Sequence, residues 1–130
     1  MEVNNLEYAF LTHLHSDHSA GLADLILTPW VLERKNSLKL FGPRGLERMA
    51  NKITEAYLED IDYRINGSQP SNLDGYRTEV KEISEGLIFQ DGNIKVEAFL
   101  NNHGDFENSF GFIFTTDDKK IVFSGDTAYS

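Results

Sequence analysis

The first half of the chain combines short apolar runs with apolar residues at helical spacing. From Leu22 to about Trp30, and again from Leu46 to Ile61, apolar side chains recur every three or four positions, which is typical of one face of a helix. We expect Trp30, Tyr57 and Leu58 to belong to the core rather than to a substrate platform. The pattern predicts strands over residues 6–11 and 38–41, and helices over residues 22–30 and 46–61.

Beyond residue 75 the apolar period changes from helical to alternating. Residues 88–100 alternate on either side of Asp91-Gly92, a pair typical of a hairpin turn. Alternation returns over residues 110–114, and residues 121–123 form a short apolar run typical of a buried strand. Strands and helices therefore alternate first and antiparallel strands follow, which predicts an α+β fold with helices against one face of a sheet.

The composition indicates one ordinary globular domain. The chain has 130 residues, of which 40% are apolar and 25% charged, and it has no cysteine, which excludes a disulfide framework and a thiol nucleophile. Its net charge of −9 disfavours generic nucleic-acid binding. No run approaches the ~18 apolar residues of a membrane span, so we expect no membrane partner and take the cytoplasm as the default compartment.

Three of the four histidines lie within six residues of one another, directly after the first predicted strand. In an extended segment His13 and His15 point to the same side, and after a turn Asp17 and His18 can face a second point nearby. Neutral imidazole and carboxylate are ligands that divalent metals prefer, zinc above all. Solvated loop histidines are the alternative, but so dense a cluster favours metal binding.

The fourth histidine and a late aspartate follow other predicted strands. Taken alone, His103 is a loop histidine, and Asp126 in Gly125-Asp126-Thr127 is a turn or helix-cap residue. Both become candidate ligands because a site for two metal ions needs more donors than residues 13–18 supply.

These motifs together resemble the metallo-β-lactamase superfamily. The run His13-x-His15-x-Asp17-His18, the lone His103 and Gly125-Asp126-Thr127 are similar to the branch of ribonuclease Z and the arylsulfatase-like hydrolases. The resemblance implies an αββα sandwich, a mixed or antiparallel sheet arrangement with flanking helices. Because that fold is roughly twice this length, we expect residues 1–130 to be a partial domain without its N-terminal strands and C-terminal half. A partial sheet with exposed edges favours a homo-oligomer.

The resemblance also implies a metal centre with two zinc ions, although manganese or iron suits the same ligands. A metal-bound hydroxide would attack the substrate, and Asp17 would act as the catalytic residue that orients or deprotonates the attacking water. The implied ligands are His13, His15 and His103 for the first ion, Asp17 and His18 for the second, and Asp126 between them.

Three functions remain open from the sequence. The first is hydrolysis of a phosphodiester or sulfate ester, with a small anionic substrate favoured over RNA by the charge of −9. The second is tRNA 3′ processing, as in ribonuclease Z, although only a hairpin and a turn fit between His103 and Asp126, where many such enzymes carry a basic arm. The third is a metal-binding module without catalysis.

Overall fold

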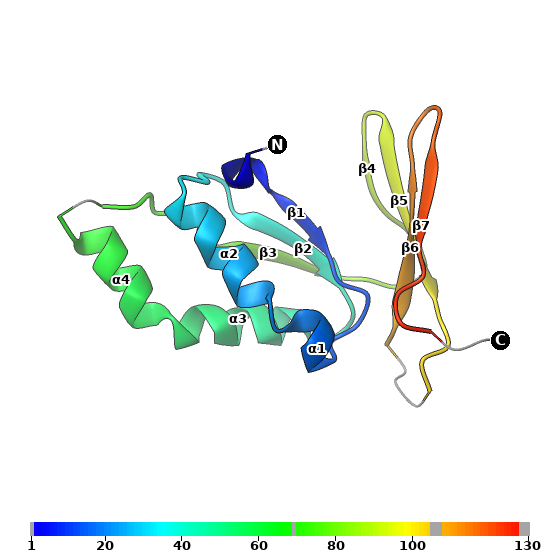
Figure 1. Ribbon diagram of the computed structural model, residues 1–130, viewed down its shortest axis with the longest axis horizontal. Coiled ribbons are helices and arrows are strands. Elements are labelled where there is room, and N and C mark those ends of the chain that lie inside the picture. The colour runs from blue at the N-terminus through cyan, green and yellow to red at the C-terminus, as the bar shows by residue number, and fades with distance from the viewer. Residues whose placement is uncertain (1, 69, 105–107, 128–130) are drawn as a thin grey trace.

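The computed structural model describes residues 2–68, 70–104 and 108–127 and arranges them in three layers. Helices cover one face of a three-stranded sheet, and a four-stranded sheet lies on its other side (Figure 1). In the part of the chain that the structure describes, no helix covers the outer face of the four-stranded sheet (Figure 1). The α+β prediction is therefore confirmed, and these residues form the αββ part of the expected sandwich.

The elements follow one another in the predicted order, with additions. A single 3-10 turn, η1, spans Val3–Asn5. The strands are β1 Tyr8–Phe10, β2 Leu38–Gly42, β3 Thr78–Glu82, β4 Gly86–Asp91, β5 Ile94–Leu100, β6 Phe110–Thr115 and β7 Lys120–Phe123. The helices are α1 Ser16–Ser19, α2 Leu22–Val31, α3 Leu46–Ala56 and α4 Leu58–Asn66.

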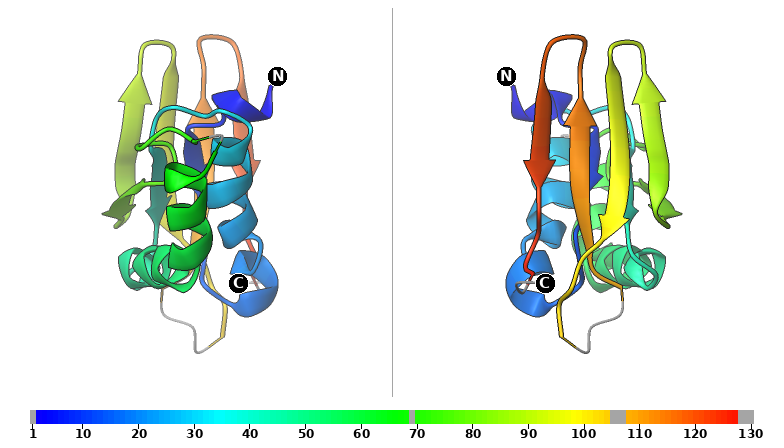
Figure 2. Two further views of the ribbon diagram at one scale, coloured as in Figure 1. Left: turned by 90° about the vertical axis from the view of Figure 1, so that its left-hand side faces the viewer. Right: turned by 90° about the vertical axis from the view of Figure 1, so that its right-hand side faces the viewer.

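The first sheet is parallel, with strand order β1-β2-β3. Its register pairs Phe10 with Phe41 and Leu40 with Val80. Parallel neighbours require crossover connections, and the helices α2 and α3 lie within these connections. The carboxyl end of β1 therefore opens directly into the histidine-rich segment, and the helices pack on the face of the sheet away from the second sheet (Figure 2).

The second sheet is an antiparallel meander with strand order β4-β5-β6-β7. The hairpin predicted around Asp91-Gly92 is confirmed, and Gly92 has the positive φ of 53° that such a tight turn favours. Residues 110–114 form β6 as predicted, and they pair with β5 so that Phe112 lies opposite Ala98.

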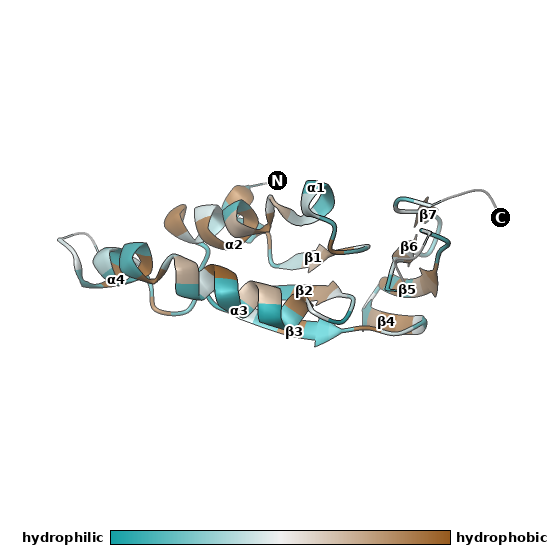
Figure 3. Cartoon of the chain, turned by 90° about the horizontal axis from the view of Figure 1, so that it is seen from below, coloured by the Kyte–Doolittle hydropathy of each residue, from teal (hydrophilic) through white to brown (hydrophobic). Residues whose placement is uncertain are grey.

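Two apolar clusters hold the layers together. One lies between the helices and the parallel sheet and includes Trp30, as predicted; the other lies between the two sheets and includes stacked Phe10 and Phe41 rings 4.9 Å apart. Figure 3 shows the matching hydropathy, with brown segments on the inner parts of α2, α3 and β2. The β1 strand contributes to both clusters, which fixes the position of the segment that follows it.

A buried arginine joins the segment before β1 to the helical layer by hydrogen bonds. The guanidinium of Arg34 donates hydrogen bonds to the carbonyl oxygens of Leu6, Leu25, Ile26 and Gly75 at 2.6–3.2 Å. Burial lowers the pKa of Arg34, opposed by the carboxylate of Glu7. The guanidinium thereby joins backbone carbonyl groups of three separate segments of the chain.

Two helices replace the single helix predicted over residues 46–61. Helix α3 ends at Ala56, Tyr57 takes a non-helical conformation (φ −100°, ψ 18°), and α4 starts at Leu58. The change of direction turns Tyr57 and Leu58 toward solvent, so the prediction that they belong to the core is wrong. Helical spacing continued through the break, and the sequence pattern therefore concealed it.

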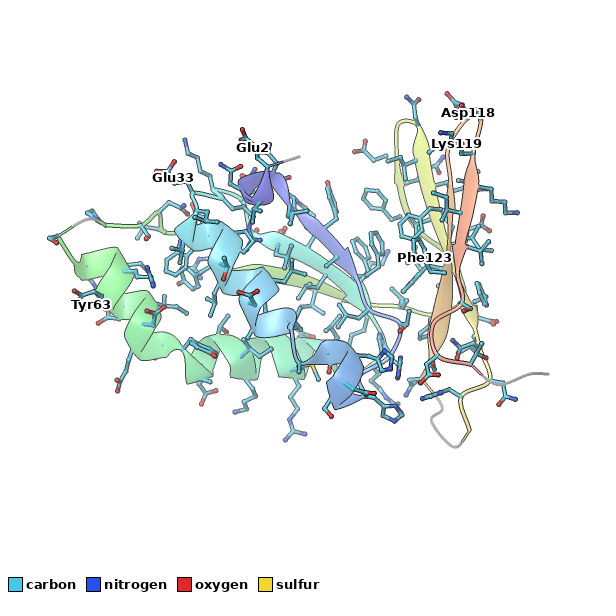
Figure 4. The ribbon with its side chains drawn as sticks, viewed as in Figure 1. Glu2, Glu33, Tyr63, Asp118, Lys119 and Phe123 are labelled. Carbon is cyan, nitrogen blue, oxygen red and sulfur yellow. The ribbon has the colours of Figure 1, made fainter. Side chains whose placement is uncertain are left out.

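The last strand, β7, is also more exposed than predicted. Residues 121–123 were expected to be buried, but Ile121, Val122 and Phe123 are each more than half exposed. In the described part of the chain β7 pairs with β6 alone, so it is an edge strand. Figure 4 shows Phe123 pointing from β7 toward the three-stranded sheet, where it lines an open aromatic pocket with Tyr8, Phe10 and Phe114.

Strand β3 was not predicted, because its sequence TEVKE offers a single apolar residue. Pairing with β2 rather than apolar alternation places it in the sheet. None of the helices formed by the described residues is long and apolar enough to cross a membrane.

Candidate metal centre

The histidine-rich segment lies where the two sheets meet. Leu11 donates its backbone N–H to Phe41 O (2.8 Å), and Phe110 donates to Thr12 O (2.8 Å), so the segment is bonded to both sheets as it leaves β1. The chain then turns into the short helix α1. The buried Ser19 hydroxyl reaches back from α1 to His15 O at 2.9 Å and holds the turn closed.

His13, His15 and His103 form a first group of possible metal ligands. One ring nitrogen of each lies within 4.8 Å of the other two. The rings of His13 and His15 are 4.9 Å apart, and His103 Nε2 lies 3.0 Å from His15 Nδ1 although 88 residues separate them. The three side chains assigned to one ion by the family resemblance are therefore adjacent in space.

A second group consists of His13, His18 and Asp126, whose ligand atoms also lie within 4.8 Å of one another. The carboxylate oxygen Oδ2 of Asp126 is 3.7 Å from His18 Nε2 and 3.6 Å from His103 Nε2. Asp126 therefore lies close to a ligand atom of each group, and its role as a bridging ligand stays a prediction.

Asp17 lies outside both groups. Its Oδ2 is 3.5 Å from His18 Nε2, and its side chain is 80% exposed. It is adjacent to the second group, and its roles as metal ligand and catalytic residue stay predictions.

The electrostatics of the cluster favour the neutral form of His13. Burial lowers the pKa of His13, and the neighbouring His18, His103 and His15 lower it further, against a raising effect of Asp126. A neutral imidazole has a free lone pair, which is the form that binds a metal ion. The side chain is also fully buried, so its position is set by packing.

The donor set fits zinc or a similar divalent ion. Four imidazoles and one carboxylate converge, and no sulfur ligand is available because the chain has no cysteine. The predicted ligands His13, His15, His18, His103 and Asp126 are thus brought together within one cluster.

Residues that hold this cluster in place were not foreseen from the sequence. Ser19 fixes the turn after His15, and Asn101 donates a hydrogen bond to the segment that carries Asp126. Ser19 lies four residues after His15, a spacing that could have indicated a side-chain bond back to His15 O. Asn101 had no such local signal.

Comparison with known proteins agrees with this arrangement. Residues 1–130 match the family model described as "Anti-Pycsar protein Apyc1". A ribonuclease Z from Mycobacterium sp. (strain KMS) is 33% identical over 126 residues, which is 95% of this chain and 44% of the relative. A ribonuclease Z from Mycolicibacterium gilvum (strain PYR-GCK) is 29% identical over 131 residues, again 44% of its length. The chain thus spans less than half the length of these relatives.

Solved structures show the same fold. The short form of human tRNase Z matches 97% of this chain and 51% of its own, with a TM-score of 0.71 and 23% identity. A metallo-β-lactamase fold protein from Bacillus subtilis matches 98% of this chain and 44% of its own, with a TM-score of 0.65 and 14% identity. The chain therefore belongs to the family of the anti-Pycsar protein Apyc1; it has the metallo-β-lactamase fold and is similar in sequence to ribonuclease Z.

Proposed function

We propose that this chain carries the metal centre of a hydrolase that cleaves phosphodiester bonds. The observation that supports the proposal is the convergence of four histidines and Asp126 at the junction of the two sheets. Two divalent ions are the expected complement of this donor set, with zinc preferred and manganese or iron as alternatives.

Each residue has a defined role in this proposal. His13, His15 and His103 would hold one ion, His18 the other, and Asp126 would bridge them, with Asp17 as a further ligand of the second ion. When bound, the ions would supply water activated near neutral pH and would neutralise charge on the phosphoryl group. Asp17 is exposed beside His18, where its carboxylate could accept the proton of an attacking water.

For the substrate, the curated relatives favour RNA. The two relatives described above carry the name ribonuclease Z and are 33% and 29% identical to this chain, so the 3′ end of precursor tRNA is the first candidate. A small phosphodiester or sulfate ester is the second candidate. The net charge of −9 favours it, because an acidic surface repels a long polyanion.

The test combines metal content with turnover. The 130-residue protein is loaded with zinc or manganese, its metal content is measured by elemental mass spectrometry, and hydrolysis of bis(p-nitrophenyl) phosphate and of precursor tRNA is followed. Asp126→Asn is expected to lower turnover by at least about a hundredfold, because loss of a metal ligand costs more than loss of an outer partner. Asp118→Asn, at the far tip of the β6–β7 hairpin (Figure 4), is the matched control and should retain turnover.

The outcomes separate the candidates. Cleavage of precursor tRNA that weakens steeply with salt supports the RNA substrate, and metal-dependent turnover of the chromogenic ester alone supports the small substrate. Bound metal without turnover of either would overturn the hydrolase proposal for this chain and favour a metal-binding module.

A further inference from the structure

Two loops that are distant in the sequence carry the last two ligands of the cluster. His103 follows β5, and Asp126 follows β7. Figure 1 shows both segments running at the same end of the four-stranded sheet, and Figure 2 shows this from two further sides. The relative position of the two loops determines whether the carboxylate of Asp126 lies close to both His18 and His103.

Two hydrogen bonds join these loops directly. The side-chain amide Nδ2 of Asn101 donates to Ser124 O at 2.7 Å, and the hydroxyl of Thr127 donates to Asn102 O at 2.8 Å. They bracket Asp126 on both sides. The carboxylate between them lies 3.6 Å from His103 Nε2 and 3.7 Å from His18 Nε2.

The backbone of Asn101 is bonded to a buried residue, whereas the segment that carries Asp126 is exposed. The backbone N–H of Asn101 bonds to Ser109 O at 3.0 Å, and Ser109 is buried. By contrast, residues 124–127 are exposed and continue an edge strand. A bond between the two therefore restrains mainly the segment that carries Asp126.

The close approach of the two loops also depends on Gly125. Its φ of 69° lies in the left-handed region, and a Cβ at this position would come within 2.9 Å of Phe110 O and 3.1 Å of Asn101 Nδ2.

The side-chain amide of Asn101 makes a single hydrogen bond within the described residues. Its Nδ2 donates to Ser124 O, whereas its buried Oδ1 accepts no hydrogen bond there.

We propose that Asn101 is a positioning residue that holds the carboxylate of Asp126 close to both His18 and His103 and thereby sets the affinity of the metal that Asp126 binds. The inference rests on the proposed metal centre. It assigns to Asn101 a role through Asp126 rather than contact with a metal or substrate.

The test is a cobalt(II) titration followed by visible absorption, with the Asp126→Asn variant identifying the binding step that depends on Asp126. Asn101→Ala is expected to weaken that step by roughly tenfold and to change its absorption spectrum, because outer partners of metal ligands typically contribute this much. Binding at His13, His15 and His103 should weaken less, because three histidine donors remain for that ion when Asp126 is displaced. Asn102→Ala is the matched control, since the Asn102 side chain is exposed and its backbone carbonyl is retained.

A second pair of variants distinguishes loss of the hydrogen bond from a packing defect. Asn101→Asp keeps the shape but removes the donor and opposes Ser124 O, whereas Asn102→Asp adds the same charge nearby. Only Asn101→Asp should weaken the Asp126-dependent step, and the thermal midpoints of the metal-free proteins should remain similar. Equal cobalt affinity in the Asn101 and Asn102 variants would overturn this inference alone. Failure of the wild-type protein to bind cobalt would overturn the proposed metal centre itself.

Discussion

His13 is the residue shared by both groups of ligand atoms. It lies in the segment that follows β1, is fully buried, and contacts the rings of His15, His18 and His103 at centroid distances of 4.5–4.9 Å. Its depressed pKa follows from burial first and from the neighbouring imidazoles second. The neighbouring imidazoles are candidate metal ligands, and they also oppose protonation of His13 when no cation is bound.

This opposition makes the stability of the metal-free protein depend on pH. The unfolded chain protonates His13 near its ordinary pKa of 6.5, whereas the folded protein resists protonation to lower pH. Below about pH 6.5 the unfolded state binds more protons, so the free energy of unfolding is expected to fall as the pH drops from 7.5 to 5.5. Urea unfolding of the chelator-treated protein at several pH values measures this.

The variant His13→Asn provides the comparison. It removes the titrating group, so its free energy of unfolding should fall less over the same pH interval. An identical pH dependence in the variant and the wild type would show that His13 is not the group responsible.

At the scale of elements, β2 and α4 show how burial separates residues of the same type. Leu40 lies in the central strand of the parallel sheet and is 0% exposed, whereas Leu58 begins α4 after the break at Tyr57 and is 59% exposed. Apolar character alone led to the prediction that Leu58 belongs to the core. The turn between α3 and α4 places it at the surface instead.

These two leucines give a matched prediction. Leu40→Ala is expected to lower the free energy of unfolding by about 2–5 kcal/mol, because it leaves a cavity between the helices and the sheet. Leu58→Ala should change it by no more than about 0.5 kcal/mol. Chemical denaturation followed by circular dichroism measures both, and a large loss for Leu58→Ala would contradict the observed break between the helices.

At the scale of the whole molecule, the two sheets leave apolar edges uncovered. In the described part of the chain β1 and β7 are edge strands, and an open pocket of about 270 Å³ between them is lined by aromatic residues of both sheets. Uncovered edge strands tend to pair with another chain. Self-association is therefore a property to expect of these 130 residues.

Sedimentation velocity over a range of concentrations tests this expectation. Val122→Lys places a charge on β7, where Val122 is 56% exposed, and should weaken self-association by about tenfold or more, equivalent to about 1.4 kcal/mol. Tyr63→Lys, on the 78% exposed side chain of α4 (Figure 4), is the control. If both variants associate like the wild type, the β7 edge is not the interface.

Much of the local structure was predictable from the sequence, because it depends on short-range patterns. The hairpin at Asp91-Gly92, the strand over residues 110–114 and the buried Trp30 all follow from alternation, turn chemistry and helical spacing. The break at Tyr57 and strand β3 were missed, because apolar spacing continued through the first and the second has a polar sequence.

The candidate site was likewise predictable only where it depends on local spacing. Spacing within residues 13–18 was sufficient to indicate a metal site, since a turn after an extended segment brings those side chains together. The tertiary structure decided that His103 lies against His15 across 88 residues and that Asp126 lies close to both His18 and His103. It also decided that Asp17 lies outside both groups and that Asn101 joins the two distant loops. These arrangements depend on strand order and on packing between sheets, and no local pattern encodes a contact between segments that the fold alone brings together.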